Sequence, residues 1–169
     1  IVREDYCRDN GGIIFPNPNA PTAIYENLEF VEDILRHNRN SIVIVDEAYI
    51  DFAGPSAMEL IDKYDNLIVT QTFSKSRSMA GMRIGYAVSN PDLIRCLNDV
   101  KYSFNSYTMN RAALVCGAEA VKDRAYFETN IRKIVATRER AKAELKDLGF
   151  EFTDSRANFL FARHPEYDG

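Results

Sequence analysis

The segment Ile42-Val-Ile-Val-Asp-Glu-Ala-Tyr49 decides the fold, because an apolar half and a polar half follow each other directly. The continuous apolar run from Ile42 to Val45 suits a parallel strand that is buried on both faces of a sheet. Asp46 and Tyr49 come after this strand. Ligands of open α/β sheets bind beyond the carboxyl ends of the strands, where both side chains are expected to project. The segment therefore predicts an α/β fold with a ligand site at this strand end.

Strand and helix patterns alternate on both sides of this segment. Short apolar runs between turn residues predict strands, and apolar residues at helical spacing predict helices. Asn90-Pro91 begins one helix, because asparagine suits a helix cap and proline suits the first turn. The strand at 84–88 is expected to run in a different direction, because only a short segment separates it from Lys75. We expect strands at 12–16, 42–45, 67–70, 84–88, 150–152 and 158–161, and helices at about 25–37, over about ten residues from Asn90, and over 109–148.

Lys75 lies 29 residues after Asp46 in the run Thr70-Gln-Thr-Phe-Ser-Lys-Ser-Arg-Ser-Met-Ala-Gly-Met-Arg-Ile-Gly-Tyr86. A lysine amine can form a Schiff base with an aldehyde. Hydroxyl side chains beside it and Arg83, eight residues later, can hold a phosphate. A carboxylate at a buried strand end can protonate a pyridine nitrogen. These three capacities together are what pyridoxal 5'-phosphate demands of a protein.

Each of these residues also has a simpler interpretation. An apolar strand followed by Asp-Glu describes the magnesium site of nucleotide hydrolases too, but the chain has no GxxxxGK[ST] phosphate loop. Taken singly, Asp46 is a capping carboxylate at a strand end and Arg83 is a member of a surface ion pair. Asn17 and Asn19, in the proline-rich segment 17–22, can serve only their own turn.

Four segments carry a family resemblance: Asn17-Pro-Asn-Ala-Pro-Thr22, Val45-Asp-Glu-Ala-Tyr-Ile-Asp-Phe52, Thr72-Phe-Ser-Lys-Ser-Arg-Ser-Met-Ala-Gly-Met-Arg-Ile-Gly-Tyr86 and Ala157-Asn-Phe-Leu160. With them the chain resembles the central part of fold-type I pyridoxal-phosphate aminotransferases, and most of all the histidinol-phosphate aminotransferases. The segments span most of the chain in the family's order and spacing. The lysine segment is highly specific for the superfamily, and the second segment favours the histidinol-phosphate branch less specifically.

The resemblance implies roles for particular residues. Lys75 resembles the catalytic lysine that forms the Schiff base and moves the proton. Asp46 resembles the carboxylate that pairs with the pyridine nitrogen, and Tyr49 resembles the tyrosine that hydrogen-bonds the phenolic oxygen of the cofactor. The residues that resemble the phosphate ligands are Thr72, Ser74 and Arg83.

The proline-rich segment departs from the family pattern. The family usually places an asparagine directly before Pro-Thr, where it reaches the phenolic oxygen of the cofactor, but this chain has Ala20 there. We therefore assign Asn19 as the cofactor contact. The glycine that usually follows the threonine is Ala23 in this chain.

The resemblance also implies an architecture. We expect residues 1–108 to be part of a three-layer cofactor-binding large domain, with a mainly parallel sheet and flanking helices. Residues 109–148 are expected to form a long interdomain helical segment, and residues 149–169 to begin a small α+β domain. The chain begins with Ile1 and not with methionine, so we expect a piece of a longer polypeptide that is inactive by itself.

The implied reaction is transamination between histidinol phosphate or imidazole acetol phosphate and glutamate or 2-oxoglutarate, in histidine biosynthesis, by a homodimer. An aromatic aminotransferase and a threonine-phosphate decarboxylase are related alternatives. A non-catalytic aminotransferase-like domain of a regulator is an alternative of another class.

Composition limits the partners. The chain is 46% hydrophobic with a net charge of −4, so it has no electrostatic signature for nucleic acid, and no apolar run is long enough to span a membrane. The cysteines, Cys7, Cys96 and Cys116, are widely spaced without a CxxC pair, which fits reduced thiols of a cytoplasmic protein better than disulfides or zinc. We expect His37 and His164 to be ordinary surface residues and expect no metal.

Overall fold

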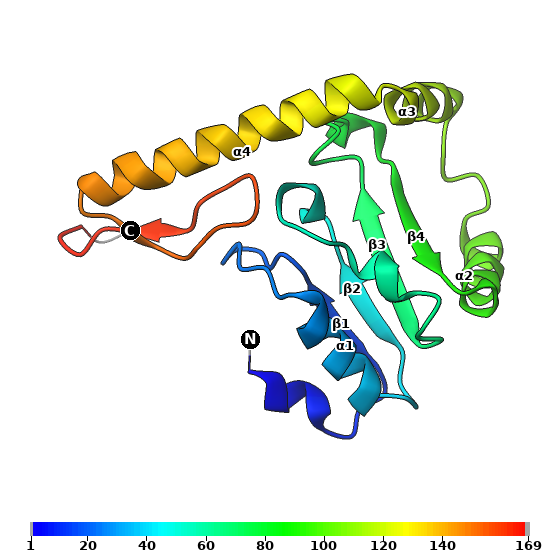
Figure 1. Ribbon diagram of the computed structural model, residues 1–169. Coiled ribbons are helices and arrows are strands. Elements are labelled where there is room, and N and C mark those ends of the chain that lie inside the picture. Colours follow the sequence, from blue (N-terminus) through cyan, green and yellow to red (C-terminus); the bar gives the residue numbers. More distant parts are fainter. Residues whose placement is uncertain (1, 168–169) are drawn as a thin grey trace.

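The computed structural model describes residues 2–167 and is built around a mixed, mainly parallel sheet. Its strands lie in the order β1-β2-β3-β4, with the first three parallel and β4 antiparallel to β3 (Figure 1). This arrangement confirms the predicted α/β class and the different direction of the strand near residue 85. The strands are β1 (Ile13–Pro16), β2 (Val43–Asp46), β3 (Leu67–Thr72) and β4 (Gly85–Ser89).

Helix α1 (Leu28–His37) covers one face of the sheet. It begins three residues later than predicted, at the point where the Asn27 side chain accepts a hydrogen bond from the Phe30 N–H. The opposite face is open at the sheet edge, where Ile14 is 70% exposed, so burial on both faces is not reached at β1. The core between helix and sheet consists of buried apolar side chains from both layers, chiefly Val31, Ile34, Leu35, Phe15, Val43, Val45, Leu67 and Val69.

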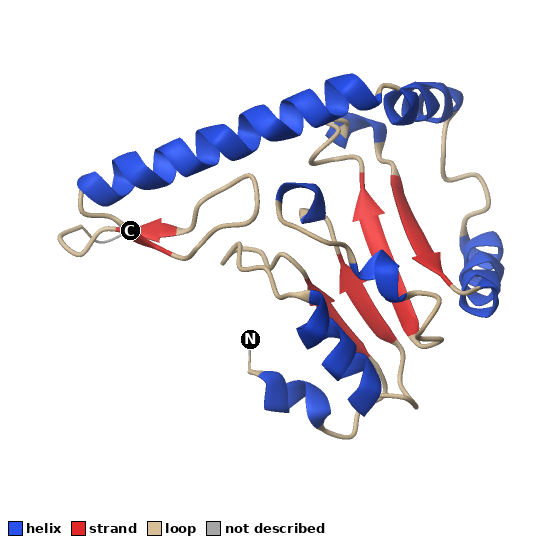
Figure 2. Ribbon diagram, in the orientation of Figure 1, coloured by secondary structure: helices blue, strands red, loops and turns tan. Residues whose placement is uncertain are grey.

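Short 3-10 helices fill the connections between the strands, and Figure 2 shows them as brief helical turns. One of them, η1, precedes β1 and packs beside α1. Two follow β2 and one joins β3 to β4. Their bounds are η1 (Arg3–Cys7), η2 (Ile50–Phe52), η3 (Ala57–Leu60) and η4 (Ala80–Met82).

Three longer helices follow the sheet: α2 (Pro91–Phe104), α3 (Arg111–Lys122) and α4 (Arg124–Asp147). Asn90 caps α2 as predicted, but the helix has 14 residues and not about ten. The helical region predicted over 109–148 is interrupted at Asp123, which ends α3 and caps α4 by accepting a hydrogen bond from the Tyr126 N–H. No helix within residues 2–167 is long and apolar enough to cross a membrane.

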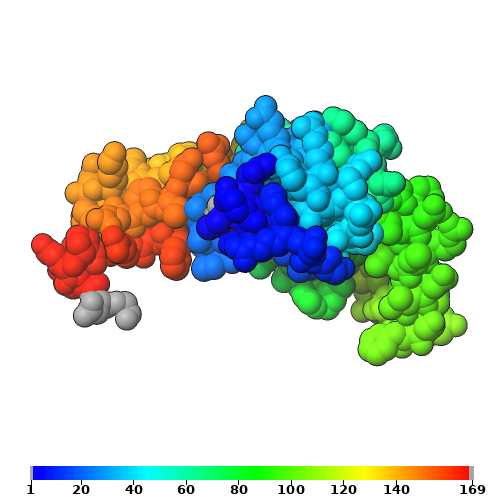
Figure 3. All heavy atoms as spheres, turned by 90° about the horizontal axis from the view of Figure 1, so that it is seen from below, coloured from blue at the N-terminus to red at the C-terminus, as the bar shows by residue number. Residues whose placement is uncertain are grey.

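The last part of the chain is a small hairpin of β5 (Glu151–Phe152) and β6 (Ala162–Arg163). The strand predicted at 158–161 is wrong, because this stretch forms a turn in which the Ser155 hydroxyl donates to the Phe159 carbonyl. His164 is only half-exposed, beside the Phe150 ring. In the space-filling view the C-terminal segment forms one end of an elongated molecule (Figure 3).

Candidate active site

The carboxyl ends of the three parallel strands β1, β2 and β3 lie side by side at one end of the sheet. We call this end the strand-end edge. The Asn17 N–H donates to the Asp46 carbonyl at 2.9 Å, and the Glu47 N–H donates to the Thr70 carbonyl at 2.8 Å, so the strand ends are aligned by hydrogen bonds. Helix α4 runs past this edge (Figure 1). Because parallel strands point the same way, segments that are distant in the sequence leave the sheet side by side.

Lys75 and Tyr49 come together at this edge. The Lys75 Nζ lies 5.1 Å from the centre of the Tyr49 ring, within the range of a cation–π contact. The Tyr49 ring packs edge-on against Phe159, with ring centres 5.1 Å apart. Phe159 is far away in sequence, and no sequence pattern indicated a role for it. The contact fixes the Tyr49 ring, while the Lys75 ammonium stays exposed.

Asp46 is half-buried at the end of β2 and is sparsely bonded. Its carboxylate accepts one hydrogen bond, from the Ala48 N–H at 3.2 Å. Within residues 2–167 neither Asp46 nor Lys75 has an ion-pair partner. Two opposite charges without protein partners near one strand edge make a site that a ligand with complementary groups can neutralise.

The hydroxyl residues predicted to bind phosphate form a cluster. The Thr72 hydroxyl lies 3.0 Å from the Ser74 hydroxyl and 3.3 Å from the Ile84 carbonyl, and it accepts from the Ser74 N–H. Thr72 pairs with Gly85 on the neighbouring strand, and Arg83 lies two residues before Gly85 in the sequence. Arg83 is exposed, has a left-handed backbone (φ 56°) and donates to the Ala80 carbonyl at 3.0 Å.

Asn19 is engaged within its own turn. Its side-chain amide donates to the Thr22 hydroxyl at 2.7 Å, and its backbone carbonyl accepts from the Ala23 N–H. Asn17 is fully buried, and its side chain both donates to and accepts from the Glu26 backbone. The structure thus supports the turn-forming interpretation of Asn19, whereas Asn17 binds Glu26 outside the segment 17–22. The cofactor contact of Asn19 stays a prediction.

Glu47 is the buried neighbour of Asp46, and no sequence pattern indicated a supporting role for it. Its carboxylate accepts hydrogen bonds from the Ser56 hydroxyl, the Ala57 N–H and the Gln71 amide at 2.5–2.8 Å. Burial raises the pKa of Glu47, and these three donors oppose that rise. Gln71 in turn accepts from the Tyr86 hydroxyl, so the network links β2, β3 and β4 beneath the strand-end edge.

The two residues that directly follow Lys75, Ser76 and Arg77, anchor its loop. The buried Ser76 hydroxyl donates to the Asp51 carboxylate at 2.5 Å. The Arg77 guanidinium lies 4.1 Å from the Phe127 ring centre and donates to the Ala120 carbonyl at 2.6 Å. The loop is therefore held from both sides, by η2 and by the α3–α4 junction. Asp51 and Arg77 lie inside the motifs quoted for the family resemblance, but no sequence pattern indicated these contacts.

Arg138 joins α4 to the rest of the site. It is buried, and its Nη1 donates to the Phe52 carbonyl at 2.9 Å and to the Ala157 carbonyl at 3.1 Å. These bonds tie η2 and the C-terminal turn to the helix. The turn that carries Phe159 is thereby held against Tyr49.

Two hollows of about 320 Å³ each flank this edge. One lies between the 76–79 loop and the α3–α4 junction. The other lies between α4 and the turn at 158–160. Asp46, Tyr49, Lys75 and Arg83 are not among the residues that line these two hollows.

The comparisons with known proteins agree with this geometry. The family model "Aminotransferase class I and II" matches residues 3–167. A histidinol-phosphate aminotransferase of Pseudomonas putida is 57% identical over 165 residues, which are 98% of this chain and 47% of that protein. The chain thus spans about half the length of the curated relatives it matches.

Solved structures show the same fold. The histidinol-phosphate aminotransferase of Clostridium acetobutylicum matches with a TM-score of 0.87 at 29% identity, over 97% of this chain and 52% of that one. The enzyme of Sinorhizobium meliloti, solved in complex with pyridoxal-5'-phosphate, matches with a TM-score of 0.81 at 26% identity, over 90% of this chain and 42% of that one. The chain therefore belongs to the class I and II aminotransferase family.

Proposed function

We propose that this chain is the cofactor-binding part of a pyridoxal-phosphate-dependent aminotransferase. The proposed reaction interconverts histidinol phosphate and imidazole acetol phosphate, with 2-oxoglutarate and glutamate as the second pair, in histidine biosynthesis. The observation that carries the proposal is the contact of Lys75 with the Tyr49 ring, beyond the strand that ends at Asp46, where the ammonium and the carboxylate lack ion-pair partners within residues 2–167. Curated relatives with 52–57% identity bear the name of this activity.

The residues at this edge fit the groups of pyridoxal 5'-phosphate. The cofactor has an aldehyde, a ring nitrogen, a phenolic oxygen and a phosphate dianion, and the edge offers a matching group for each. The exposed Lys75 amine suits the aldehyde, the Asp46 carboxylate suits a protonated ring nitrogen, and the Tyr49 hydroxyl suits the phenolic oxygen. The groups that suit the phosphate are the Thr72 and Ser74 hydroxyls and the Arg83 guanidinium.

Each residue then has a definite task. When bound, the cofactor supplies an electron sink for the substrate's α-carbon. The Lys75 amine would hold the cofactor and, in its free form, would take the α-proton of the substrate as a base. The Asp46 carboxylate keeps a proton on the ring nitrogen by a charge-assisted hydrogen bond. Phe159 keeps the Tyr49 ring in place beside Lys75.

Substrate choice and assembly are further parts of the proposal. Amino-acid and phosphorylated keto substrates are proposed as the small-molecule partners, and the activity as that of the whole protein. We also infer a cytoplasmic homodimer. The three free thiols support a reducing compartment, and the exposed apolar side chains of the α2 region, such as Phe104 and Tyr107, support association.

The decisive experiment replaces Lys75 with alanine in the intact protein. Borohydride reduction of the wild type with its cofactor should leave a pyridoxyl group on the peptide that contains Lys75, detected by mass spectrometry. Lys75→Ala should lose this modification and at least about 10³-fold in transamination, because it removes both the attachment point and the base. Lys146→Ala, at an exposed lysine in the last turn of α4, is the matched control and should behave as wild type.

A pyridoxyl group on a different lysine, or full activity of Lys75→Ala, would contradict the assignment. Substrate specificity needs a second assay of the intact protein with histidinol phosphate, aromatic amino acids and threonine phosphate. Fastest turnover of histidinol phosphate supports the proposed substrate. Preference for an aromatic donor, or release of carbon dioxide from threonine phosphate, would replace it with one of the related activities.

A further inference from the structure

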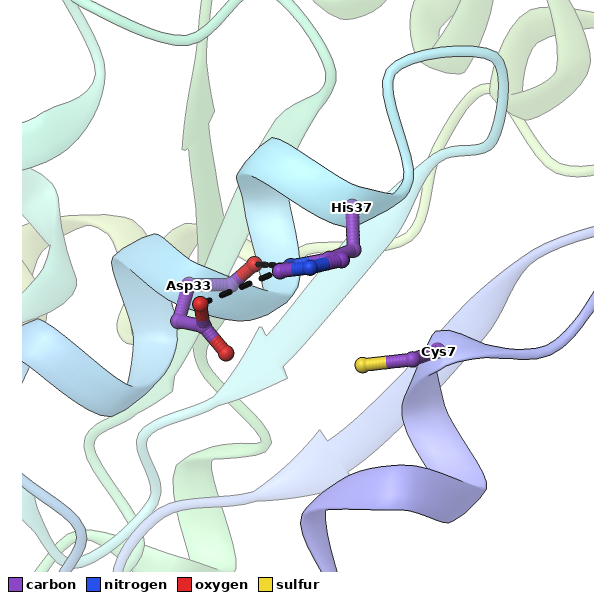
Figure 4. A group of neighbouring side chains, drawn as sticks. All are labelled: Cys7, Asp33 and His37. Atoms are coloured by element: carbon purple, nitrogen blue, oxygen red, sulfur yellow. Dashed lines mark hydrogen bonds and ion pairs between the residues drawn. The ribbon is translucent and has the colours of Figure 1, made fainter.

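A second chemical cluster lies away from the strand-end edge, on the surface shared by η1 and α1. Cys7 from η1 faces Asp33 and His37 of α1 (Figure 4). One potential ligand atom from each residue, a thiol sulfur, a carboxylate oxygen and a ring nitrogen, lies within 4.8 Å of the others. Thiolate, carboxylate and imidazole are the ligand types of protein-bound zinc. The cluster brings together residues that are up to 30 positions apart in the sequence.

The two residues on α1 are arranged as a ligand pair. Asp33 and His37 are separated by one helical turn, which places their side chains on the same face. The His37 Nδ1 lies 2.8 Å from the Asp33 backbone carbonyl and 3.4 Å from its carboxylate Oδ1. A histidine that donates from one ring nitrogen to a backbone carbonyl has a fixed orientation and keeps the lone pair of its other nitrogen for a metal.

The third residue is held in place by its neighbours. The Asn38 side chain, directly after His37, donates to the carbonyl of Tyr6, directly before Cys7, at 2.8 Å. Asn38 is buried, and the Tyr6 ring packs against Phe15 with centres 5.5 Å apart. The connection between η1 and α1 is therefore anchored in the core. Cys7 is exposed, and its thiol donates to the Arg3 carbonyl at 3.6 Å, a weak bond that metal binding would replace.

We propose that Cys7, Asp33 and His37 bind a Zn²⁺ ion, with water in the fourth position. A tetrahedral zinc site needs ligand atoms about 3.3–3.8 Å apart, given bonds of about 2.0–2.3 Å, so binding draws the cluster together by about 1 Å. A thiolate and a carboxylate neutralise the dication. Arg3 pairs with the Oδ2 atom of Asp33, so Oδ1 is the carboxylate oxygen left for the ion, and Nε2 is the free ring nitrogen of His37.

This site is independent of the proposed transaminase function and has a different consequence. A bound ion joins η1 to α1 and adds stability by binding only the folded state. The proposal departs from three expectations of the sequence: that Cys7 is a passive thiol, that His37 is an ordinary surface residue, and that the chain binds no metal. Cys96 and Cys116 are free and exposed as well, and they serve as internal controls.

The test is a Co²⁺ titration of the intact, metal-free protein, followed by Zn²⁺ competition. It is done in the Lys75→Ala background so that no cofactor absorbance overlaps. We expect one equivalent of Co²⁺ to produce a thiolate charge-transfer band with tetrahedral visible bands. Cys7→Ser should abolish the thiolate band, whereas Cys96→Ser and Cys116→Ser should keep it. His37→Ala should weaken binding beyond the about 10–100-fold that loss of an outer hydrogen-bond partner costs.

Thermal unfolding gives a second measurement. Zn²⁺ should raise the melting temperature of the parent protein and leave that of Cys7→Ser unchanged, while the far-ultraviolet circular dichroism of both stays the same. The proposal is overturned by a thiolate band that survives Cys7→Ser, by the absence of saturable binding, or by octahedral Co²⁺ spectra without sulfur. None of these outcomes depends on transaminase activity, so the two proposals can fail separately.

Discussion

Asp46 at the strand-end edge and Glu47 directly beneath it are neighbouring carboxylates that differ in how many hydrogen bonds they accept. Asp46 lies at the edge with one weak hydrogen bond from the backbone. Glu47, the next residue, lies in the layer beneath and accepts three hydrogen bonds from η3 and β3. The fold therefore supplies Glu47 with three hydrogen-bond donors and leaves the Asp46 carboxylate available to a ligand. A buried polar group with a full set of partners supports the fold, whereas one without them is prepared for a ligand.

The same contrast separates the residues of the Lys75 loop. Ser76 and Arg77 are bonded to η2 and to the α3–α4 junction. The Lys75 amine, directly before them, has no hydrogen-bond or ion-pair partner among the described residues and lies over the face of the Tyr49 ring. The loop is thus rigid around a free amine, which is how a reactive group is held in position without being neutralised.

The largest effect that distinguishes the two acids is expected for activity. Asp46→Ala in the intact protein should reduce turnover about 10²–10³-fold, because it removes the charge that holds the cofactor's ring proton. The free energy of unfolding should change by no more than about 0.5 kcal/mol. Asp62→Ala, at an exposed acid elsewhere, is the control. Steady-state kinetics and urea unfolding measure both quantities, and a large loss of stability in Asp46→Ala would show that the edge is structural.

The reverse result is expected in the layer beneath. Glu47→Ala leaves the Ala57 N–H and the Gln71 amide without their acceptor, and should lower the free energy of unfolding by about 2–4 kcal/mol. Glu59→Ala, an exposed glutamate in the same 3-10 helix as Ala57, should change it little. Urea unfolding is the measurement. Unchanged stability of Glu47→Ala would mean that the network contributes nothing.

A smaller effect concerns pH. Burial raises the pKa of Glu47 above its ordinary 4.5, so the folded protein binds this proton more tightly than the unfolded chain does. The stability contributed by Glu47 is then greatest below pH 4.5 and declines as the pH rises through the raised pKa. Glu47→Gln cannot titrate at this position. As the pH rises through this window, the wild type should therefore lose unfolding free energy relative to the variant. Parallel pH profiles of the two proteins would contradict the raised pKa.

The sequence predicted the four-stranded sheet well because its strands are indicated by short-range sequence patterns. The β-branched run before Asp46 and the cap at Asn90 are short-range signals that need no distant partner. The predicted strand at 158–161 failed for the opposite reason. Its apolar residues suit a strand, but the Ser155 turn, the bond from Arg138 and the contact of Phe159 with Tyr49 use this segment to close the site.

The candidate site divides in the same way. The lysine and strand-end motifs identified Lys75, Asp46 and Tyr49 as chemistry-bearing residues, since their types and spacing match the needs of one cofactor. Nothing in the sequence indicated the support given by Glu47 and Arg138. Their partners come from segments up to 86 positions away, and hydrogen bonds over such separations leave no periodic pattern in the sequence.

By itself, the order of residues determined the fold class and predicted the position of the ligand edge and the reactive side chains. Those properties follow from local propensity and from the rule that parallel strands end together. The tertiary structure alone decided which of two neighbouring acids is satisfied, which turn covers Tyr49, and that Cys7 meets Asp33 and His37. These outcomes depend on packing between distant segments, where burial and hydrogen-bond partners are assigned only once the chain has folded.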